Sequence, residues 1–163
     1  MAAEKPFGKK NRLMRMMHLL RRIHSSPLAV THRQNQLTFI HNGRQFFQSL
    51  YAAIHLSESF ILVEFYIIRN DETGATLASL LAEAVRRGVR VLLIYDFIGC
   101  IDTPADYFRD MAHQGIELIP FNVPSFRRGV RWFDRRDHRK MVIIDGSLAF
   151  LGGFNVGDEY SGL

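Results

Sequence analysis

The chain has 163 residues, of which 47% are hydrophobic, and this is enough apolar material for one domain with a real core. A single cysteine, Cys100, excludes an internal disulfide and suits a reducing compartment, and nothing matches a cysteine–histidine zinc pattern. Residues 1–24 hold 7 of the 21 basic and 1 of the 16 acidic side chains, so their net charge is 7 − 1 = +6, while that of the whole chain is +5. The rest of the chain therefore has a net charge of −1, which argues against nucleic acid as a partner.

Residues 1–35 form a basic N-terminal segment, within which residues 9–23 predict an amphipathic helix. Its apolar stripe has helical spacing and consists of Leu13, Met16, Met17 and Leu20. Such a helix binds an anionic membrane surface, where each Lys or Arg contributes about 1 kcal/mol. A frayed basic tail, or a helix that packs on another part of the protein, explains the pattern equally well. Charges interrupt every apolar run, so we expect neither a transmembrane segment nor a signal peptide.

From residue 36 onward, the pattern alternates between strand and helix. The expected strands cover residues 37–40, 60–68, 89–95, 116–120, 141–144 and 148–151. The expected helices cover residues 44–56, a segment from about residue 74 to 87, and residues 104–114. The run 60–68 is almost continuously apolar, which is typical of a strand covered on both faces. This order predicts an α/β fold with a mixed β-sheet sandwiched by helices and without an internal repeat.

The residues around the last two strands carry the predicted site. His138 and Lys140 lie two apart at the start of a strand, so their side chains project to the same face. A turn at 145–147 returns the chain and brings Gly153 and Asn155 toward His138. We expect His138 to act as a nucleophile and the other three to bind the oxygens of a phosphate group. These groups supply the charge and no carboxylate cluster is present, so we expect no metal and no cofactor.

Two carboxylates near this site each have two interpretations. Asp145 is either a catalytic residue that orients an imidazole or a cap of the hairpin turn, where Asp-Gly is favoured on its own account. Glu64 interrupts an apolar strand, and a buried carboxylate must be paired or protonated. It either supports the site by contacting Lys140 or a histidine, or it faces solvent or pairs with an arginine.

The loop before His138 mixes arginines with aromatic side chains. The residues expected to contact lipid are Arg131, Trp132, Arg135 and Arg136. Arginines bind phosphate and aromatic rings favour the membrane interface, so this mixture suits phospholipid headgroups. The same mixture also binds single-stranded nucleic acid, and a plain solvated loop is a third interpretation.

The spacing H-x-K-x4-D-x6-G-G-x-N over residues 138–155 resembles the HKD motif of the phospholipase D superfamily. Segments outside the motif narrow the resemblance to bacterial cardiolipin synthases. These segments are Asn42-Gly43 and residues 60–67, 71–74, 87–91, 95–99 and 150–160. The likeness covers roughly residues 36 to 163. It implies a phospholipase D-like domain over residues 36–163 with one HKD half-domain. We expect this domain to be incomplete and truncated at its C-terminus, because it lacks the closing strand and helix that such a half-domain normally has. Only one of the two HKD motifs of a full-length enzyme is present.

The resemblance implies a phosphatidyltransferase that acts on anionic phospholipids through a phosphohistidine at His138. A second histidine would come from another HKD half, supplied in trans by a homodimer or by a missing C-terminal region. The expected partner is an anionic membrane, with the protein peripheral on the cytoplasmic side of a bacterial membrane. The alternatives are a phospholipase D-like phosphodiesterase, either lipid hydrolase or nuclease, and an inactive half-domain that binds membranes.

Overall fold

The computed structural model describes residues 29–32, 35–124 and 135–162, in two units that are Met1–His41 and Asn42–Leu163. In the first unit, β1 (Ala29–His32) and β2 (Asn35–Thr38) pair as an antiparallel hairpin. The helix predicted over residues 9–23 lies outside the described residues. Of the helices that are described, none is long and apolar enough to cross a bilayer.

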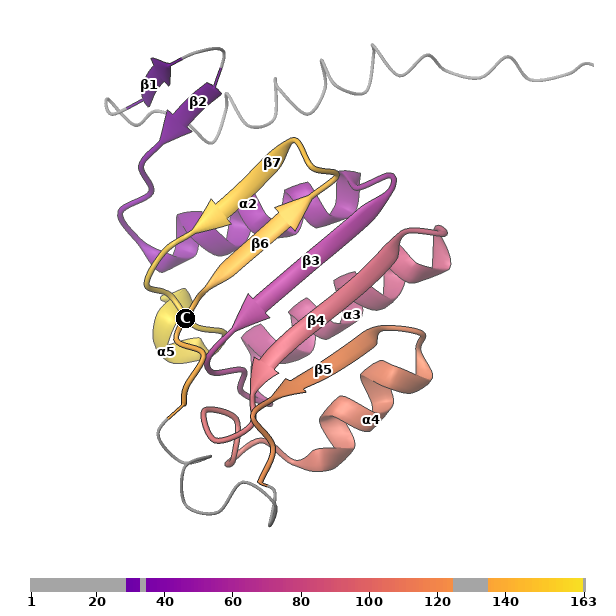
Figure 1. The fold of residues 1–163 in the computed structure, drawn as a ribbon. Coiled ribbons are helices and arrows are strands. Elements are labelled where there is room, and N and C mark those ends of the chain that lie inside the picture. The colour runs from indigo at the N-terminus through magenta and orange to yellow at the C-terminus, as the bar shows by residue number, and fades with distance from the viewer. Residues whose placement is uncertain (1–28, 33–34, 125–134, 163) are drawn as a thin grey trace, which may run out of the picture. The chain divides into compact units, whose positions relative to one another are not determined.

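The second unit contains a five-stranded sheet in the order β5-β4-β3-β6-β7 (Figure 1). Strands β3 (Phe60–Phe65), β4 (Arg90–Asp96) and β5 (Glu117–Phe121) run parallel to one another. Strands β6 (Met141–Ile144) and β7 (Leu148–Leu151) form a hairpin, and β6 pairs antiparallel with β3. The predicted mixed sheet with flanking helices is therefore confirmed.

The two longest described helices each start after a residue whose side chain caps the helix N-terminus. Helix α2 (Gly43–Leu56) is capped by Asn42, which accepts a hydrogen bond from the Gln45 N–H at 2.9 Å. Helix α3 (Glu72–Arg86) is capped in the same way by Asp71. Helices α4 (Ala105–His113) and α5 (Asp158–Ser161) complete the unit. No residue larger than glycine fits at position 43, because a Cβ atom there would lie 1.5 Å from the carbonyl oxygen of Tyr160 in α5.

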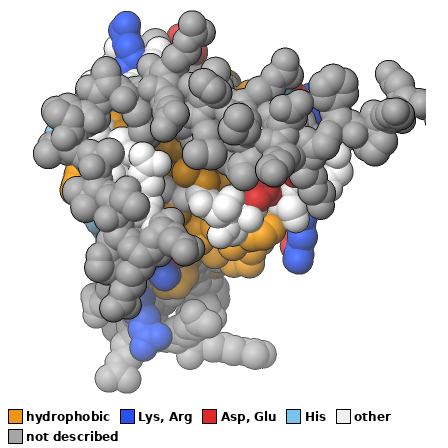
Figure 2. Space-filling model, turned by 90° about the horizontal axis from the view of Figure 1, so that it is seen from above, with side chains coloured by type: hydrophobic (Ala, Val, Ile, Leu, Met, Phe, Trp, Pro, Cys, Tyr) orange, Lys and Arg blue, Asp and Glu red, His pale blue; other side chains and the backbone are white. Residues whose placement is uncertain are grey.

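The core lies between the sheet and helices α2, α3 and α4. Tyr51 of α2 and Tyr107 of α4 donate hydrogen bonds to the backbone of α3, so the three helices are neighbours. Figure 1 shows α2 and α3 behind the sheet, and strand residues of this face are fully buried. The alternate residues face the other way: Leu62 of β3 is 37% exposed and Leu151 of β7 is 71% exposed. Among the described residues, β3 is thus covered on one face rather than two. In the view from above, hydrophobic side chains of described residues reach the surface (Figure 2).

Candidate functional site

The predicted site residues gather at one edge of the sheet. The carboxyl end of β3 meets the start of β6, because Glu64 pairs with Met141 in the antiparallel register. The neighbouring strand β4 ends at Asp96 on the same edge, since β3 and β4 run parallel. The residues after β3, after β4 and before β6 therefore lie together, which is the edge where open α/β sheets bind their ligands.

His138 and Lys140 contact each other at this edge, as their spacing predicts. The Lys140 Nζ atom lies 2.9 Å from His138 Nδ1 and donates a hydrogen bond to the His138 carbonyl oxygen at 2.8 Å. Lys140 is only 8% exposed. Burial lowers the pKa of Lys140, and the charge of Asp137 opposes that shift. The site thus holds a largely buried ammonium in direct contact with an exposed imidazole.

Tyr66 is a site residue that the sequence did not single out. Its ring centroid lies 4.6 Å from that of His138, and Lys140 Nζ lies 5.2 Å from the Tyr66 centroid. The backbone of Tyr66 is also held, because Cys100 Sγ donates to its carbonyl oxygen. Burial raises the pKa of the Cys100 thiol to about 12, so this sulfur acts as an uncharged packing group. The aromatic residue directly after an apolar strand was the available signal for Tyr66.

Asn155 lies beside the residues that follow Tyr66. Its amide oxygen accepts a hydrogen bond from the Ile67 N–H at 3.2 Å, and Val156 pairs with Ile68 in a parallel bridge. Because the oxygen is used in this way, the NH₂ group of Asn155 is the part that can donate to an anion. Gly153 is exposed, and a Cβ atom added there would meet no heavy atom within 4 Å. The segment around it therefore leaves room for a ligand to approach the backbone.

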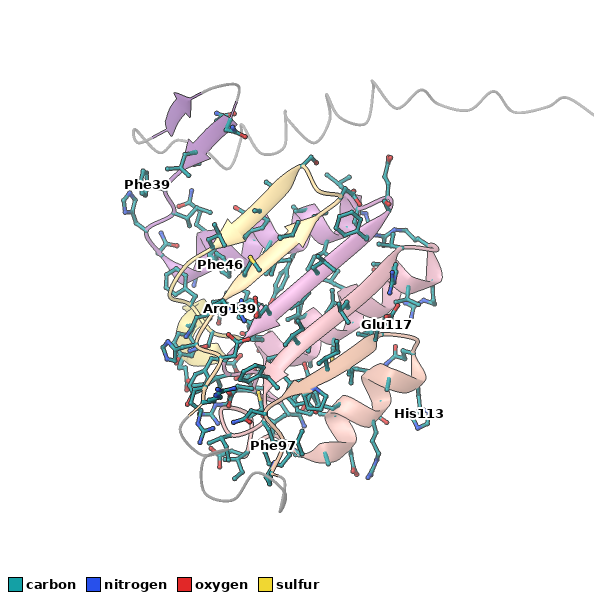
Figure 3. All side chains as sticks on the ribbon, in the orientation of Figure 1. Phe39, Phe46, Phe97, His113, Glu117 and Arg139 are labelled. Atoms are coloured by element: carbon teal, nitrogen blue, oxygen red, sulfur yellow. The ribbon has the colours of Figure 1, made fainter. Side chains whose placement is uncertain are left out.

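Glu64 has an arginine partner and does not contact Lys140. Arg139 Nη2 lies 2.9 Å from Glu64 Oε1, and Arg139 Nε lies 2.9 Å from Asp137 Oδ1. Figure 3 labels Arg139 close to the end of β3. Burial raises the pKa of Glu64 to about 7, helped by a hydrogen bond with Asp137 and opposed by the charge of Arg139. Burial also acts to raise the pKa of Asp137, but hydrogen bonds with Arg139 and Glu64 outweigh it, so the pKa of Asp137 is lowered.

Asp145 lies at the opposite end of β6 from this site. Its carboxylate accepts hydrogen bonds from the backbone N–H groups of Glu58 at 2.9 Å, Ser59 at 2.8 Å and Phe60 at 3.0 Å. The structure therefore does not bring Asp145 to His138. Of its two interpretations, the geometry matches the structural one, in which the carboxylate joins the hairpin turn to the start of β3.

The arginine loop is described only in part. Arg131 and Trp132 lie outside the described residues. Arg135 is exposed, and its carbonyl oxygen accepts hydrogen bonds from Asn122 Nδ2 at 2.8 Å and from Arg136 Nη1 at 2.9 Å. The chain near Arg135 is thereby tied to the end of β5, on the same edge of the sheet as His138.

The chemistry of these side chains suits a phosphate group. An ammonium and an amide NH₂ supply donors for phosphate oxygens, and the imidazole supplies a lone pair. Among the described residues, no group of three or more His, Cys, Asp or Glu side chains is arranged to hold a metal ion.

Comparison with known proteins relates this arrangement to one family. Residues 50–161 match the family model described as cardiolipin synthase, phospholipase D-like domain. The cardiolipin synthase of Geobacillus kaustophilus is 36% identical over 147 residues, which cover 90% of this chain and 29% of that protein. Cardiolipin synthase A of Pseudomonas putida is 40% identical over 133 residues, which cover 78% of this chain and 27% of that protein. The chain thus spans less than a third of the length of these relatives.

Two solved structures share the fold. NucT from Helicobacter pylori superimposes with a TM-score of 0.54 at 17% identity, over 73% of this chain and 72% of that one. Nuc from Salmonella typhimurium, described as a phospholipase D family member, gives a TM-score of 0.51 at 22% identity, over 69% of this chain and 66% of that one. At these identities the likeness concerns the fold alone.

Proposed function

The chain belongs to the cardiolipin synthase, phospholipase D-like family, and from that premise we propose that it forms part of a phosphatidyltransferase. The enzyme would move a phosphatidyl group from an anionic phospholipid to an alcohol, either a second phospholipid or glycerol. The observation that carries the proposal is the contact of His138 with Lys140 at 2.9 Å, beside the segment that holds Asn155.

In the first step, the Nε2 lone pair of His138 attacks phosphorus, and the bond from phosphorus to the headgroup alcohol breaks. The departing oxygen takes a proton from a second imidazole, and a phosphohistidine remains. In the second step, the acceptor hydroxyl gives its proton to that second imidazole and attacks phosphorus, and the electron pair of the phosphorus–nitrogen bond returns to His138. Lys140 and Asn155 bind the non-bridging oxygens during both steps.

The contact between Lys140 and His138 sets a condition on this mechanism. Attack through Nε2 requires the ring proton on Nδ1, which is the nitrogen that faces Lys140 Nζ. A charged Lys140 donates to Nδ1 and leaves the ring proton on Nε2. Phosphate oxygens are stronger acceptors than a neutral imidazole nitrogen, so a bound phosphate draws Nζ away from the ring. Substrate binding would in this way free Nδ1 to take a proton from water while the exposed ring releases its Nε2 proton to water.

The second imidazole is proposed to come from another HKD half. The chain holds one HKD motif, and its relatives are more than three times as long as the matched region. A second copy of this chain or another region of a longer polypeptide would supply it. We further propose that the protein acts peripherally at the cytoplasmic face of a bacterial membrane, where Arg135 and Arg136 contact anionic headgroups.

The test is incubation of the purified chain with phosphatidylglycerol vesicles, scoring cardiolipin, phosphatidic acid and lipid covalently bound to protein. His113→Ala is the matched control for His138→Ala, because His113 is exposed at the end of α4. Cardiolipin and a phosphatidyl-protein adduct in the wild type and His113→Ala, but not in His138→Ala, support the proposal. Phosphatidic acid alone, lost in His138→Ala, identifies a hydrolase instead. A folded chain that forms neither product nor adduct contradicts activity of this chain by itself.

A further inference from the structure

We propose that Asp96 is a positioning residue for His138, because its carboxylate ties the end of β4 to both supports of the imidazole. One support is the backbone that leads into His138, and the other is the Tyr66 ring beside it. The proposal rests on the proposed function only in taking His138 as the reacting group.

Asp96 is a buried carboxylate whose partners are backbone groups. It is 1% exposed. One oxygen accepts hydrogen bonds from the Ile98 N–H at 3.0 Å and the Gly99 N–H at 2.9 Å, and the other accepts from the Asp137 N–H at 2.9 Å. Among the described residues, its hydrogen-bond partners are these three N–H donors, and each bond fixes a position of the chain.

The bond to Asp137 holds the chain immediately before His138. Asp137 and Asp96 are 41 residues apart in sequence, so this bond fastens the approach to β6 onto the end of β4. The side chain of Asp137 continues the attachment by binding Arg139, which in turn pairs with Glu64 of β3. The residues on both sides of His138 are thereby fixed to neighbouring strands.

The bonds to Ile98 and Gly99 hold the chain that supports the Tyr66 ring. A Cβ atom on Gly99 would lie 2.0 Å from the Tyr66 carbonyl oxygen, so the turn after β4 packs directly against Tyr66. Cys100, the next residue, donates to the same oxygen and accepts from the Ile68 N–H. A single carboxylate therefore links the turn that packs against Tyr66 to the backbone of Asp137, and the imidazole that follows Asp137 contacts the Tyr66 ring.

The variant that tests the proposal is Asp96→Asn. The amide has the shape of the carboxylate, but its NH₂ group cannot accept, so either the Asp137 bond or the paired Ile98 and Gly99 bonds are lost. Asp102→Asn is the matched control, because Asp102 follows in the same connection but its carboxylate is 73% exposed and pairs with Arg69. If Asp96→Asn does not fold, Gly99→Ala perturbs the Tyr66 side of the same connection.

The first readout is the NMR signals of the His138 imidazole, assigned by their absence in His138→Ala. We expect Asp96→Asn to shift and broaden these signals while Asp102→Asn leaves them unchanged. The second readout is phosphatidyl transfer, for which we expect kcat to fall about tenfold or more with KM nearly unchanged, since small misplacements of a reacting group slow chemistry strongly. Wild-type imidazole signals in folded Asp96→Asn would overturn the proposal. The NMR result does not require turnover, so failure of the proposed function and failure of the Asp96 role remain distinguishable.

Discussion

Replacing Asp145 by alanine is expected to destabilise the fold and to leave the chemistry of His138 intact. Asp145 follows β6, while His138 precedes it, so the strand separates the two side chains. The Asp145 carboxylate accepts from three backbone N–H groups that lead into β3, and those bonds are the interactions that the substitution removes.

The cost follows from the exposure of the three donors. The N–H groups of Glu58 and Ser59 are exposed, so water replaces the carboxylate and each loses about 0.5–1 kcal/mol, whereas the partly buried Phe60 N–H loses about 1–2 kcal/mol. Asp145 also has a φ of 52°, and alanine in the left-handed region adds about 1 kcal/mol. The sum is about 3–5 kcal/mol, or a fall in Tm of about 10 °C for a chain of this length. Asparagine tolerates this backbone and retains one acceptor, so Asp145→Asn should lose about 1–2 kcal/mol.

Urea unfolding followed by circular dichroism measures these differences, with the His138 imidazole signals recorded on the same samples. If Asp145 has a structural role, stability should decrease from wild type to Asp145→Asn to Asp145→Ala. The His138 signals of the folded proteins should be the same in all three. An alanine variant within about 0.5 kcal/mol of wild type, combined with lost phosphatidyl transfer, would refute this reasoning and restore the catalytic interpretation of Asp145.

The remaining predictions concern pH and close packing. The raised pKa of Glu64, about 7 against an ordinary 4.5, means that the folded chain holds a proton that the unfolded chain releases between these pH values. The stability that this group contributes is therefore present at low pH and falls by about 1–3 kcal/mol as pH rises through 7. Glu64→Gln should reduce the difference in unfolding free energy between pH 5 and pH 7.5. If that difference is unchanged in the variant, Glu64 is not its source. Gly43→Ala should destabilise by more than about 2 kcal/mol, because its Cβ would meet the Tyr160 carbonyl. Gly152→Ala, which meets no heavy atom within 4 Å, is its control, and equal unfolding midpoints for the two would contradict the close approach.

The features that local sequence could predict are those carried by short-range patterns. Asn42 and Asp71 lie within three residues of the expected helix starts, and their side chains satisfy N–H groups three residues ahead. The contact of His138 with Lys140 follows from the two-residue period of an extended chain. Recognition of the family and of the mixed sheet used the same kind of information, and both predictions are confirmed.

The features that could not be predicted depend on which strands become neighbours. Glu64 and Arg139 are far apart in sequence, and they meet only because β3 lies between β4 and β6. Because of the same strand order, the Asp96 carboxylate accepts a hydrogen bond from the Asp137 N–H, and the Tyr66 ring contacts the His138 imidazole. A carboxylate within an apolar strand indicates that Glu64 has a partner. Only the order of the strands in the sheet determines that this partner is Arg139.

Successive side chains at residues 137–140 point in alternate directions, and this separates the contacts of the site from the ion pairs of Arg139. His138 and Lys140 contact each other and the Tyr66 ring, whereas Arg139 is held by two carboxylates. Because its charge is already compensated, Arg139 adds little positive potential at a bound phosphate, and Lys140 supplies that charge from a largely buried position. Changes in the carboxylate network should therefore reach His138 through the backbone, by altering its position, far more than by altering the charge around it.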